Sequence, residues 1–265
     1  MLNGRHGQKG RRQMFRIVDE AECKRYRLDC SSVLKKVCLM LKEKGFSAQF
    51  TLVGSGARNM VTRNGDGPFD LDYNLEIIKA PEEYWNDLRS LKNTIRILLD
   101  EVAGLKCFYE SQDSTSCLTA LLHFRDEPAI KFRFDVAVVT RNSSGKLCRL
   151  IHNKNAWGLG VDQYVWNEIP DSHDVAQKAK RLKAEGLWLT VRDRYVQRKN
   201  MYLSSWWDKD HPSFIIYIET VNEIYDKYFG SVRQLSSQKK LHIKSPDSGK
   251  TESGVINYGI FPRYK

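Results

Sequence analysis

Apolar residues recur along the first part of the chain with two different periods. From residue 25 to 44 they fall three and four positions apart, as on one face of a helix, and Gly45 follows as a helix stop. The short apolar run at 49–53 is strand-like and leads directly into Gly54-Ser55-Gly56. This pattern predicts a helix, a strand and a glycine-serine turn, in that order.

A strict alternation marks the next segment, residues 69–77. Every odd position there is apolar, while the even positions are Asp70, Asp72, Asn74 and Glu76. Such a period of two predicts a strand with one buried and one polar face.

Further elements follow with equally clear periods. Residues 82–103 carry apolar side chains at helical spacing up to Gly104, and residues 117–124 and 130–139 are strand-like. In the last of these strands the even positions are apolar, which places Asp135 on the polar face.

From about residue 172 the period is helical, over 174–184, 187–204 and 212–229. This change predicts a boundary between about 145 and 172. The expected organisation has four parts: a basic extension at 1–22, a mixed core at 23–145, a helical domain at 146–230 and a basic tail at 231–265.

The composition agrees with a folded domain and excludes several classes of protein. With 265 residues, 41% of them hydrophobic, the chain can bury a sizeable core. It contains no apolar run long enough for a membrane span and no secretory signal in its first twenty residues. Its six cysteines include no CxxC pair, so we expect reduced thiols, no zinc site and a cytoplasmic location.

The net charge of +11 lies almost entirely in the termini. Residues 1–16 hold five Lys/Arg and no acid, and residues 231–265 hold seven against Asp247 and Glu252. The body between them is close to neutral. Cationic tails of this kind either bind phosphate backbones such as RNA or simply solubilise the protein.

The acidic residues on the polar strand faces suggest chemistry. Asp70 and Asp72 point to the same face about 6.6 Å apart along their strand, and Asp135 is the natural third member if the two strands are neighbours. Three such carboxylates repel one another unless cations neutralise them. Ligand sets made only of oxygen favour magnesium or manganese.

The turn at Gly54 and Ser55 supplies the complementary part. Glycine allows a phosphate to approach the backbone closely, and Arg58 and Arg133 are candidates for further phosphate contacts. Arg194 and Arg198, one helical turn apart, are weaker candidates. Together these features predict a site for a metal-bridged nucleoside triphosphate with two ions, one at the acceptor oxygen and one at the leaving pyrophosphate.

The order of these motifs resembles that of the DNA polymerase beta-like nucleotidyltransferase superfamily. The matching segments read TLVGSGARN, FDLDYNLEI and FRFDVAVV, within residues 30–145. The resemblance implies an α+β fold, a mixed sheet with flanking helices followed by an all-helical C-terminal domain. It implies Gly54 and Ser55 as triphosphate binders and Asp70, Asp72 and Asp135 as catalytic metal ligands, with Asp135 also the partner of the acceptor hydroxyl. The pair Asn59-Met60 departs from the Gly-Thr or Gly-Leu of many relatives.

We therefore predict an enzyme, a nucleotidyltransferase that uses Mg²⁺ or Mn²⁺ to move a nucleoside monophosphate from a triphosphate to an acceptor hydroxyl. The basic tails favour RNA as the acceptor, while a protein, a small molecule or a second nucleotide stay open. A nonenzymatic nucleotide- or RNA-binding module on the same core, or a purely structural metal site, are the alternatives. Base preference and oligomeric state stay undetermined.

Overall fold

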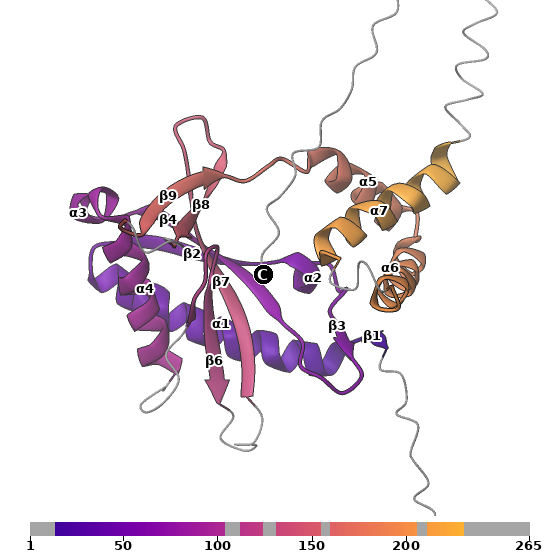
Figure 1. The fold of residues 1–265 in the computed structure, drawn as a ribbon, viewed down its shortest axis with the longest axis horizontal. Coiled ribbons are helices and arrows are strands. Elements are labelled where there is room, and N and C mark those ends of the chain that lie inside the picture. Colours follow the sequence, from indigo (N-terminus) through magenta and orange to yellow (C-terminus); the bar gives the residue numbers. More distant parts are fainter. Residues whose placement is uncertain (1–13, 104–111, 124–130, 155–159, 206–210, 231–265) are drawn as a thin grey trace, which may run out of the picture. The chain divides into compact units, whose positions relative to one another are not determined.

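The computed structural model describes residues 14–103, 112–123, 131–154, 160–205 and 211–230 (Figure 1). The chain divides into two compact units, residues 1–222 and 223–265. All strands of the described ranges and the helices up to Asn222 belong to the first unit. Of the second unit, the structure describes the last residues of one helix and a π-helical turn, η1 (Asp226–Gly230).

A seven-stranded mixed sheet forms the centre of the first unit. Five strands follow one another in the order β2-β4-β7-β6-β5, and β8 pairs with both β7 and β9. The strands β4 and β7 are parallel, and the other pairs are antiparallel. The strands are β2 (Ser47–Val53), β4 (Leu71–Lys79), β5 (Gln112–Asp113), β6 (Leu118–His123), β7 (Lys131–Arg141), β8 (Leu147–Asn153) and β9 (Gln163–Glu168). A separate two-stranded ribbon pairs β1 (Phe15–Ile17) with β3 (Thr62–Asn64).

Helices surround this sheet and continue after its last strand. They are α1 (Glu20–Glu43), α2 (Gly54–Ala57), α3 (Glu82–Asn86), α4 (Leu88–Ala103), α5 (His173–Ala184), α6 (Trp188–Leu203) and α7 (Ser213–Tyr225). In the described part of the chain, no helix has both the length and the apolar character that a membrane crossing requires. The predicted α+β class, with a mixed sheet, flanking helices and helices at the end, is confirmed.

The hydrophobic core lies between the sheet and the two long helices α1 and α4. The odd side chains of β4, from Leu71 to Ile77, are at most 2% exposed and pack into one cluster with residues such as Leu34 of α1 and Ile95 of α4. Figure 1 shows α1 and α4 on the same side of the sheet. Because strand side chains alternate, Asp72, Asn74 and Glu76 lie on the opposite face. The predicted alternation is confirmed.

The predicted helix at 82–103 is in fact two helices. The chain breaks at Asp87, whose carboxylate accepts hydrogen bonds from the Ser90 amide at 3.0 Å and the Ser90 hydroxyl at 2.7 Å. This contact satisfies amide donors at the start of α4, so a local cap interrupts an otherwise continuous apolar period.

The segment 146–172, predicted to begin the helical domain, contains strands instead. Both β8 and β9 extend the sheet, and β8 alternates between buried and half-buried side chains. The four-part division of the chain stays a prediction. Among the described residues, the α-helices of its predicted helical domain are α5, α6 and α7.

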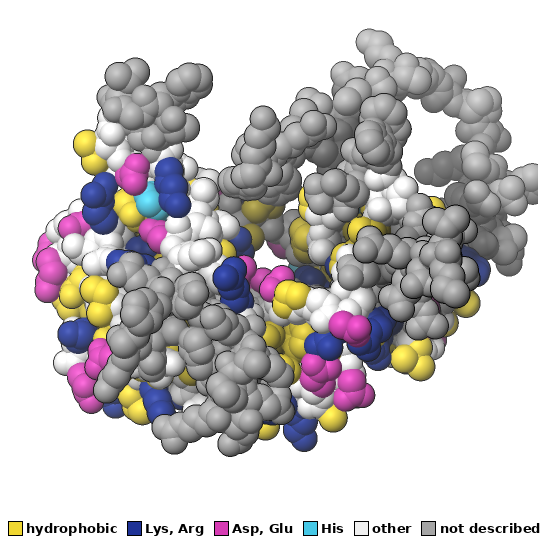
Figure 2. Space-filling model, turned by 60° about the horizontal axis from the view of Figure 1, so that its bottom comes forward, with side chains coloured by type: hydrophobic (Ala, Val, Ile, Leu, Met, Phe, Trp, Pro, Cys, Tyr) yellow, Lys and Arg dark blue, Asp and Glu magenta, His cyan; other side chains and the backbone are white. Residues whose placement is uncertain are grey.

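The two basic termini, residues 1–13 and 231–265, lie outside the described residues. Over the described atoms of the face drawn in Figure 2, basic and acidic side chains are interspersed. This mixture agrees with the nearly neutral body that the sequence predicts.

Candidate active site

The glycine-serine turn directly follows β2 and forms α2, a single helical turn. Gly54 has a φ of 61°, and a Cβ added there would lie 2.5 Å from Oδ2 of Asp72. Only glycine fits between the turn and this carboxylate. The turn and Asp72 are therefore in direct contact, as the sequence predicts for parts of one site.

Helix α1 anchors the turn through the side chain of Arg27. The guanidinium of Arg27 donates to the carbonyl oxygen of Gly56 at 2.7 Å and to Oδ1 of Asn59 at 3.0 Å. Asn59 itself has a φ of 55°, a left-handed conformation that asparagine tolerates better than most residues. The departure at Asn59 from many relatives thus coincides with an unusual backbone position anchored by Arg27.

The two strands that carry the acidic residues are parallel neighbours. In their register Asp72 of β4 lies opposite Asp135 of β7, and Asp70 immediately precedes β4. Both Asp72 and Asp135 are half-buried, while Asp70 is exposed. Asp135 also accepts a hydrogen bond of 2.6 Å from the hydroxyl of Thr119 on β6. The neighbouring strands that the sequence argument required are confirmed.

The electrostatics show that the three carboxylates interact. Burial, and then the charges of Asp135 and Asp70, raise the pKa of Asp72 to about 6. Burial, and then the charge of Asp135, also raise the pKa of Asp70. Such mutual repulsion is unfavourable in a protein without a compensating cation.

Basic side chains surround this acidic cluster. Arg133 and Lys199 lower the pKa of Asp70, and Arg149 and Arg58 lower that of Asp72, each against the stronger effects that raise them. Arg133 is exposed, as expected for a residue two positions from Asp135 on the same strand face. The guanidinium of Arg58 lies 4.0 Å above the ring of Tyr217, so part of its surface packs on α7.

Three residues near the carboxylates were missed by the sequence reasoning: Thr119, Arg149 and Lys199. Lys199 of α6 donates to Oγ1 of Thr62 at 2.8 Å, and burial lowers its pKa to about 8 against the opposing effect of Asp70. A signal was present, because Lys199 continues the stripe of Val191 and Tyr195, both buried, at intervals of four.

The two arginines singled out on the same helix each have a side-chain partner. Arg198 pairs with Glu219 of α7 at 2.8 Å, and Arg194 donates to Gln197. In these positions Arg198 stabilises the packing of α6 on α7.

The donor atoms of the acidic cluster are carboxylate oxygens, a type that suits divalent cations. Carboxylates gathered on two adjacent strands, where neighbouring carboxylates help to raise the pKa values of Asp70 and Asp72, are stabilised by a bound cation. Within the described ranges, however, no three His, Cys, Asp or Glu side chains are already gathered in the arrangement of a metal site. The fit therefore rests on the charge and the register of the carboxylates, and their role as ligands stays a prediction.

No protein-family model and no curated protein sequence matches the chain. Solved structures do match it. The cyclic AMP-GMP synthase DncV of Vibrio cholerae, in complex with the linear intermediate 5′ pppA(3′,5′)pG, aligns with a TM-score of 0.56 at 10% identity, over 81% of this chain and 69% of DncV. The chain has the nucleotidyltransferase fold of DncV.

Two further comparisons complete this picture. A DncV variant in complex with ATP, GTP and 5MTHFGLU2 aligns with a TM-score of 0.57 at 10% identity, over 81% of this chain and 70% of DncV. A chain of the CdnC:HORMA-deltaN complex of Escherichia coli MS115-1 gives a lower TM-score of 0.47 at 16% identity, over 78% of this chain and 60% of the matched chain. The two DncV alignments confirm the fold implied by the motif resemblance.

Proposed function

We propose that this protein is a nucleotidyltransferase that transfers a nucleoside monophosphate from a nucleoside triphosphate to an acceptor hydroxyl. The observation that carries the proposal is the meeting of three parts at one place. Gly54 of the turn touches Asp72, and Asp72 lies opposite Asp135 in the β4–β7 register. The DncV-like fold supports the proposal, since a chain with this fold has been seen with ATP and GTP.

In this proposal each part has a distinct task. The backbone at Gly54 and the hydroxyl of Ser55 bind the outer phosphates, because no side chain at position 54 keeps them away from the acidic cluster. Lys199 and Arg133, whose charges act on Asp70, and Arg58 balance the negative charge of the triphosphate.

Asp70, Asp72 and Asp135 would hold Mg²⁺ or Mn²⁺, which supply charge stabilisation at the phosphate under attack and at the leaving group. Asp135 additionally accepts the proton of the acceptor hydroxyl, with Thr119 fixing the orientation of its carboxylate. The acceptor oxygen forms a bond to the α-phosphorus, the bond from that phosphorus to the bridging oxygen breaks, and pyrophosphate leaves.

We further propose a second nucleotide as the acceptor. The support is the DncV complex, which contains a linear intermediate made of two nucleotides, 5′ pppA(3′,5′)pG. The earlier prediction of RNA as the acceptor rests on the basic termini alone. It therefore enters the test as a separate outcome, together with a protein acceptor.

The test is transfer of label from each α-phosphate-labelled nucleoside triphosphate, with Mg²⁺, in mixtures containing all four nucleotides, cellular RNA or lysate protein. The variant Asp72→Asn keeps the shape of the side chain and removes its charge. The matched control is Glu76→Gln, which lies on the same face of β4 but pairs with Arg141 away from the cluster. We expect a loss on the order of 100-fold or more in Asp72→Asn and near-normal transfer in Glu76→Gln.

Different results point to different conclusions. Label in a nucleotide product supports the proposed acceptor, whereas label in RNA or protein replaces it. Equal activity of Asp72→Asn and the wild type would show that the assigned centre is wrong. Absence of transfer together with triphosphate binding in calorimetry would favour the nonenzymatic binding module.

A further inference from the structure

A tight turn joins β5 to β6, and its first and last residues bond to each other. The amide of Ser114 donates to the carbonyl oxygen of Cys117 at 3.0 Å, and the Ser114 hydroxyl donates to the same oxygen at 2.9 Å. In return, the amide of Cys117 donates to Oγ of Ser114 at 3.1 Å, and the same Oγ lies 3.1 Å from Sγ of Cys117. We call residues 114–117 the β5–β6 turn. These bonds fix the point at which β6 begins.

The β5–β6 turn leads directly into the part of β6 that contacts Asp135. Thr119 lies opposite Asp135 in the β6–β7 register and donates to its Oδ1 at 2.6 Å. Cys117 lies two positions before Thr119, so its side chain projects to the same face. Burial, then the charge of Asp135 and a side-chain hydrogen bond with it, raise the pKa of the Cys117 thiol. A thiol and a hydroxyl from the start of β6 therefore both face this carboxylate.

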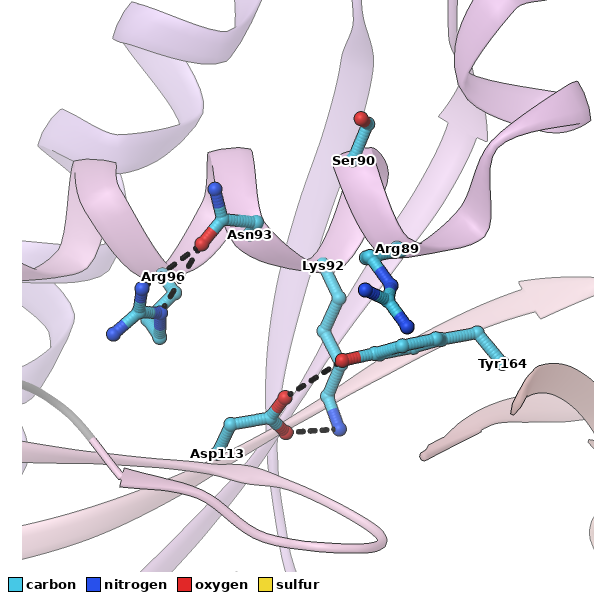
Figure 3. A pocket seen from close by; sticks show the side chains of 7 residues that line it. All are labelled: Arg89, Ser90, Lys92, Asn93, Arg96, Asp113 and Tyr164. Atoms are coloured by element: carbon cyan, nitrogen blue, oxygen red, sulfur yellow. Dashed lines mark hydrogen bonds and ion pairs between the residues drawn. The ribbon is translucent and has the colours of Figure 1, made fainter. Parts of the chain in front are cut away.

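A buried lysine holds the turn from the side of α4. Lys92 is 1% exposed, and its Nζ donates to the carbonyl oxygen of Ser114 at 2.9 Å. The same Nζ lies 2.6 Å from Oδ1 of Asp113, the last residue of β5. Figure 3 shows this ion pair at the wall of a pocket of about 390 Å³, which Arg89 and Arg96 also line. The ammonium group thus connects α4 to the residues that begin the turn.

Stability alone does not account for Lys92. An ammonium group is costly to bury, and an apolar side chain would pack here without that cost. An apolar side chain could not, however, bond to the carbonyl oxygen of Ser114. The neighbouring Thr115 carbonyl oxygen accepts a hydrogen bond of 2.8 Å from the amide of His152 on β8. The turn is therefore held by two elements, α4 and β8, as well as by its own bonds.

We propose that the β5–β6 turn positions the carboxylate of Asp135 for the transfer reaction. The positioning residues are Lys92, Ser114 and Cys117. Lys92 holds Ser114, and Ser114 holds Cys117, which faces Asp135 together with Thr119. A carboxylate held in this way presents a fixed oxygen to a bound cation and to the acceptor hydroxyl, and small displacements of a reacting group lower rates strongly. The inference rests on the role proposed above for Asp135.

The first test compares Cys117→Ala with Cys117→Ser in the full chain, by kcat and KM for label transfer. Alanine removes both contacts of the thiol, whereas serine keeps a donor and an acceptor there. We expect kcat of Cys117→Ala to fall about tenfold, and that of Cys117→Ser to stay within about twofold of the wild type. KM for the triphosphate should stay unchanged in both, because Gly54 and Ser55 lie outside the turn.

This comparison separates positioning from packing. If Cys117 only filled space, serine would be the worse replacement, because it buries a hydroxyl in place of a thiol. The matched control is Cys38→Ala, which removes another half-buried thiol, on α1, whose pKa is raised by burial alone. Its kcat should equal that of the wild type. Thermal unfolding verifies that all three variants fold.

A second pair of variants tests the lysine. Lys92→Met removes the ammonium group and should lower kcat at least about threefold. The matched control is Leu91→Met, a change to the same side chain at the adjacent, fully buried position of α4. It should leave kcat within about twofold of the wild type. Equal effects of the two substitutions would remove Lys92 from the proposal, and a Lys92→Met chain that does not fold leaves the decision to the Cys117 variants.

Binding of Mn²⁺ alone provides a readout that does not require transfer. Electron paramagnetic resonance without nucleotide measures the affinity, which should be about tenfold weaker in Cys117→Ala than in Cys38→Ala. A smaller loss is expected in Cys117→Ser, since serine keeps the donor.

Two results would overturn the proposal. One is equal kcat and equal Mn²⁺ affinity in Cys117→Ala and Cys38→Ala, and the other is a Cys117→Ser variant as impaired as Cys117→Ala. If the wild type transfers label and Asp72→Asn does not, either result removes only the positioning role. If the wild type transfers no label, the proposed function fails, and the Mn²⁺ comparison still decides whether the turn positions Asp135.

Discussion

At the scale of single residues, the main feature is a carboxylate in an unfavourable place. Asp72 lies half-buried between Asp70, Asp135 and the turn at Gly54, and its pKa of about 6 is well above the 3.8 of an ordinary aspartate. The folded protein therefore holds a proton on Asp72 more tightly than the unfolded chain does. Ionisation of Asp72 consequently destabilises the fold, as is common where stability is exchanged for a function.

The raised pKa of Asp72 predicts how Asp72→Asn changes the stability of the metal-free protein with pH. Below pH 4 Asp72 is neutral in both states, so the variant and the wild type should be about equally stable. As the pH rises through 4 to 6 the wild type loses stability, and above pH 6 the variant should be more stable by about 1–3 kcal/mol. Denaturant unfolding in EDTA at pH 4 and pH 8 measures the difference.

The same comparison tests the cation. Mg²⁺ or Mn²⁺ should raise the unfolding temperature of the wild type at pH 8 and have little effect on Asp72→Asn. An equal rise in both proteins would argue against Asp72 as a ligand.

A second residue-scale prediction concerns Gly54. Gly54→Ala should cost about 1–3 kcal/mol, because the φ of 61° is strained for alanine and the new Cβ would collide with Asp72. The matched control is Gly145→Ala, where φ is 77° but no atom lies within 4 Å of the added Cβ. Thermal unfolding and label transfer of both variants separate backbone strain from the collision.

If the collision matters, Gly54→Ala loses transfer at least about tenfold beyond the loss in Gly145→Ala. Equal effects of the two substitutions would mean that the contact between the turn and Asp72 is unimportant for transfer.

At the scale of elements, periodicity located most helices and strands but not their interruptions. Helix α1 and strand β4 agree with the apolar periods, because each buries one continuous face against the core. The break at Asp87 depends on a side chain bonding to a nearby backbone amide, which the apolar period does not record. The strands β8 and β9 were not predicted; they pair mainly with each other at the end of the sheet, where β9 has no buried side chain.

At the scale of the whole molecule, the charge distribution predicts separate tasks for the body and the termini. Most of the excess positive charge lies before residue 17 and after residue 230. Because β1 begins at Phe15 and Asn200 of α6 bonds to its backbone, a clean deletion must stop at residue 13. Chains lacking residues 1–13 or 231–265 should bind RNA more weakly and with a smaller salt dependence, while the transfer rate at a saturating acceptor stays unchanged.

Filter binding over a series of salt concentrations, with transfer rates at saturating acceptor, checks this prediction. Unchanged affinity in both deletions would assign the tails a solubilising role. An equal loss of affinity and turnover would instead place the tails at the active site.

The sequence by itself determined the local order of this protein: the periods of its main helices and strands, the Gly54-Ser55 turn, and the alternation that puts Asp70, Asp72 and Asp135 on polar strand faces. These features depend on neighbours in the chain, so they can be read from it. Only the tertiary structure decided that Asp72 faces Asp135, that the charge of Lys199 acts on Asp70, and that Arg89, Lys92 and Arg96 share a pocket with Asp113. The reason is physical, since strand pairing and helix packing bring together residues that are far apart in the chain, and no local period records which of them will meet.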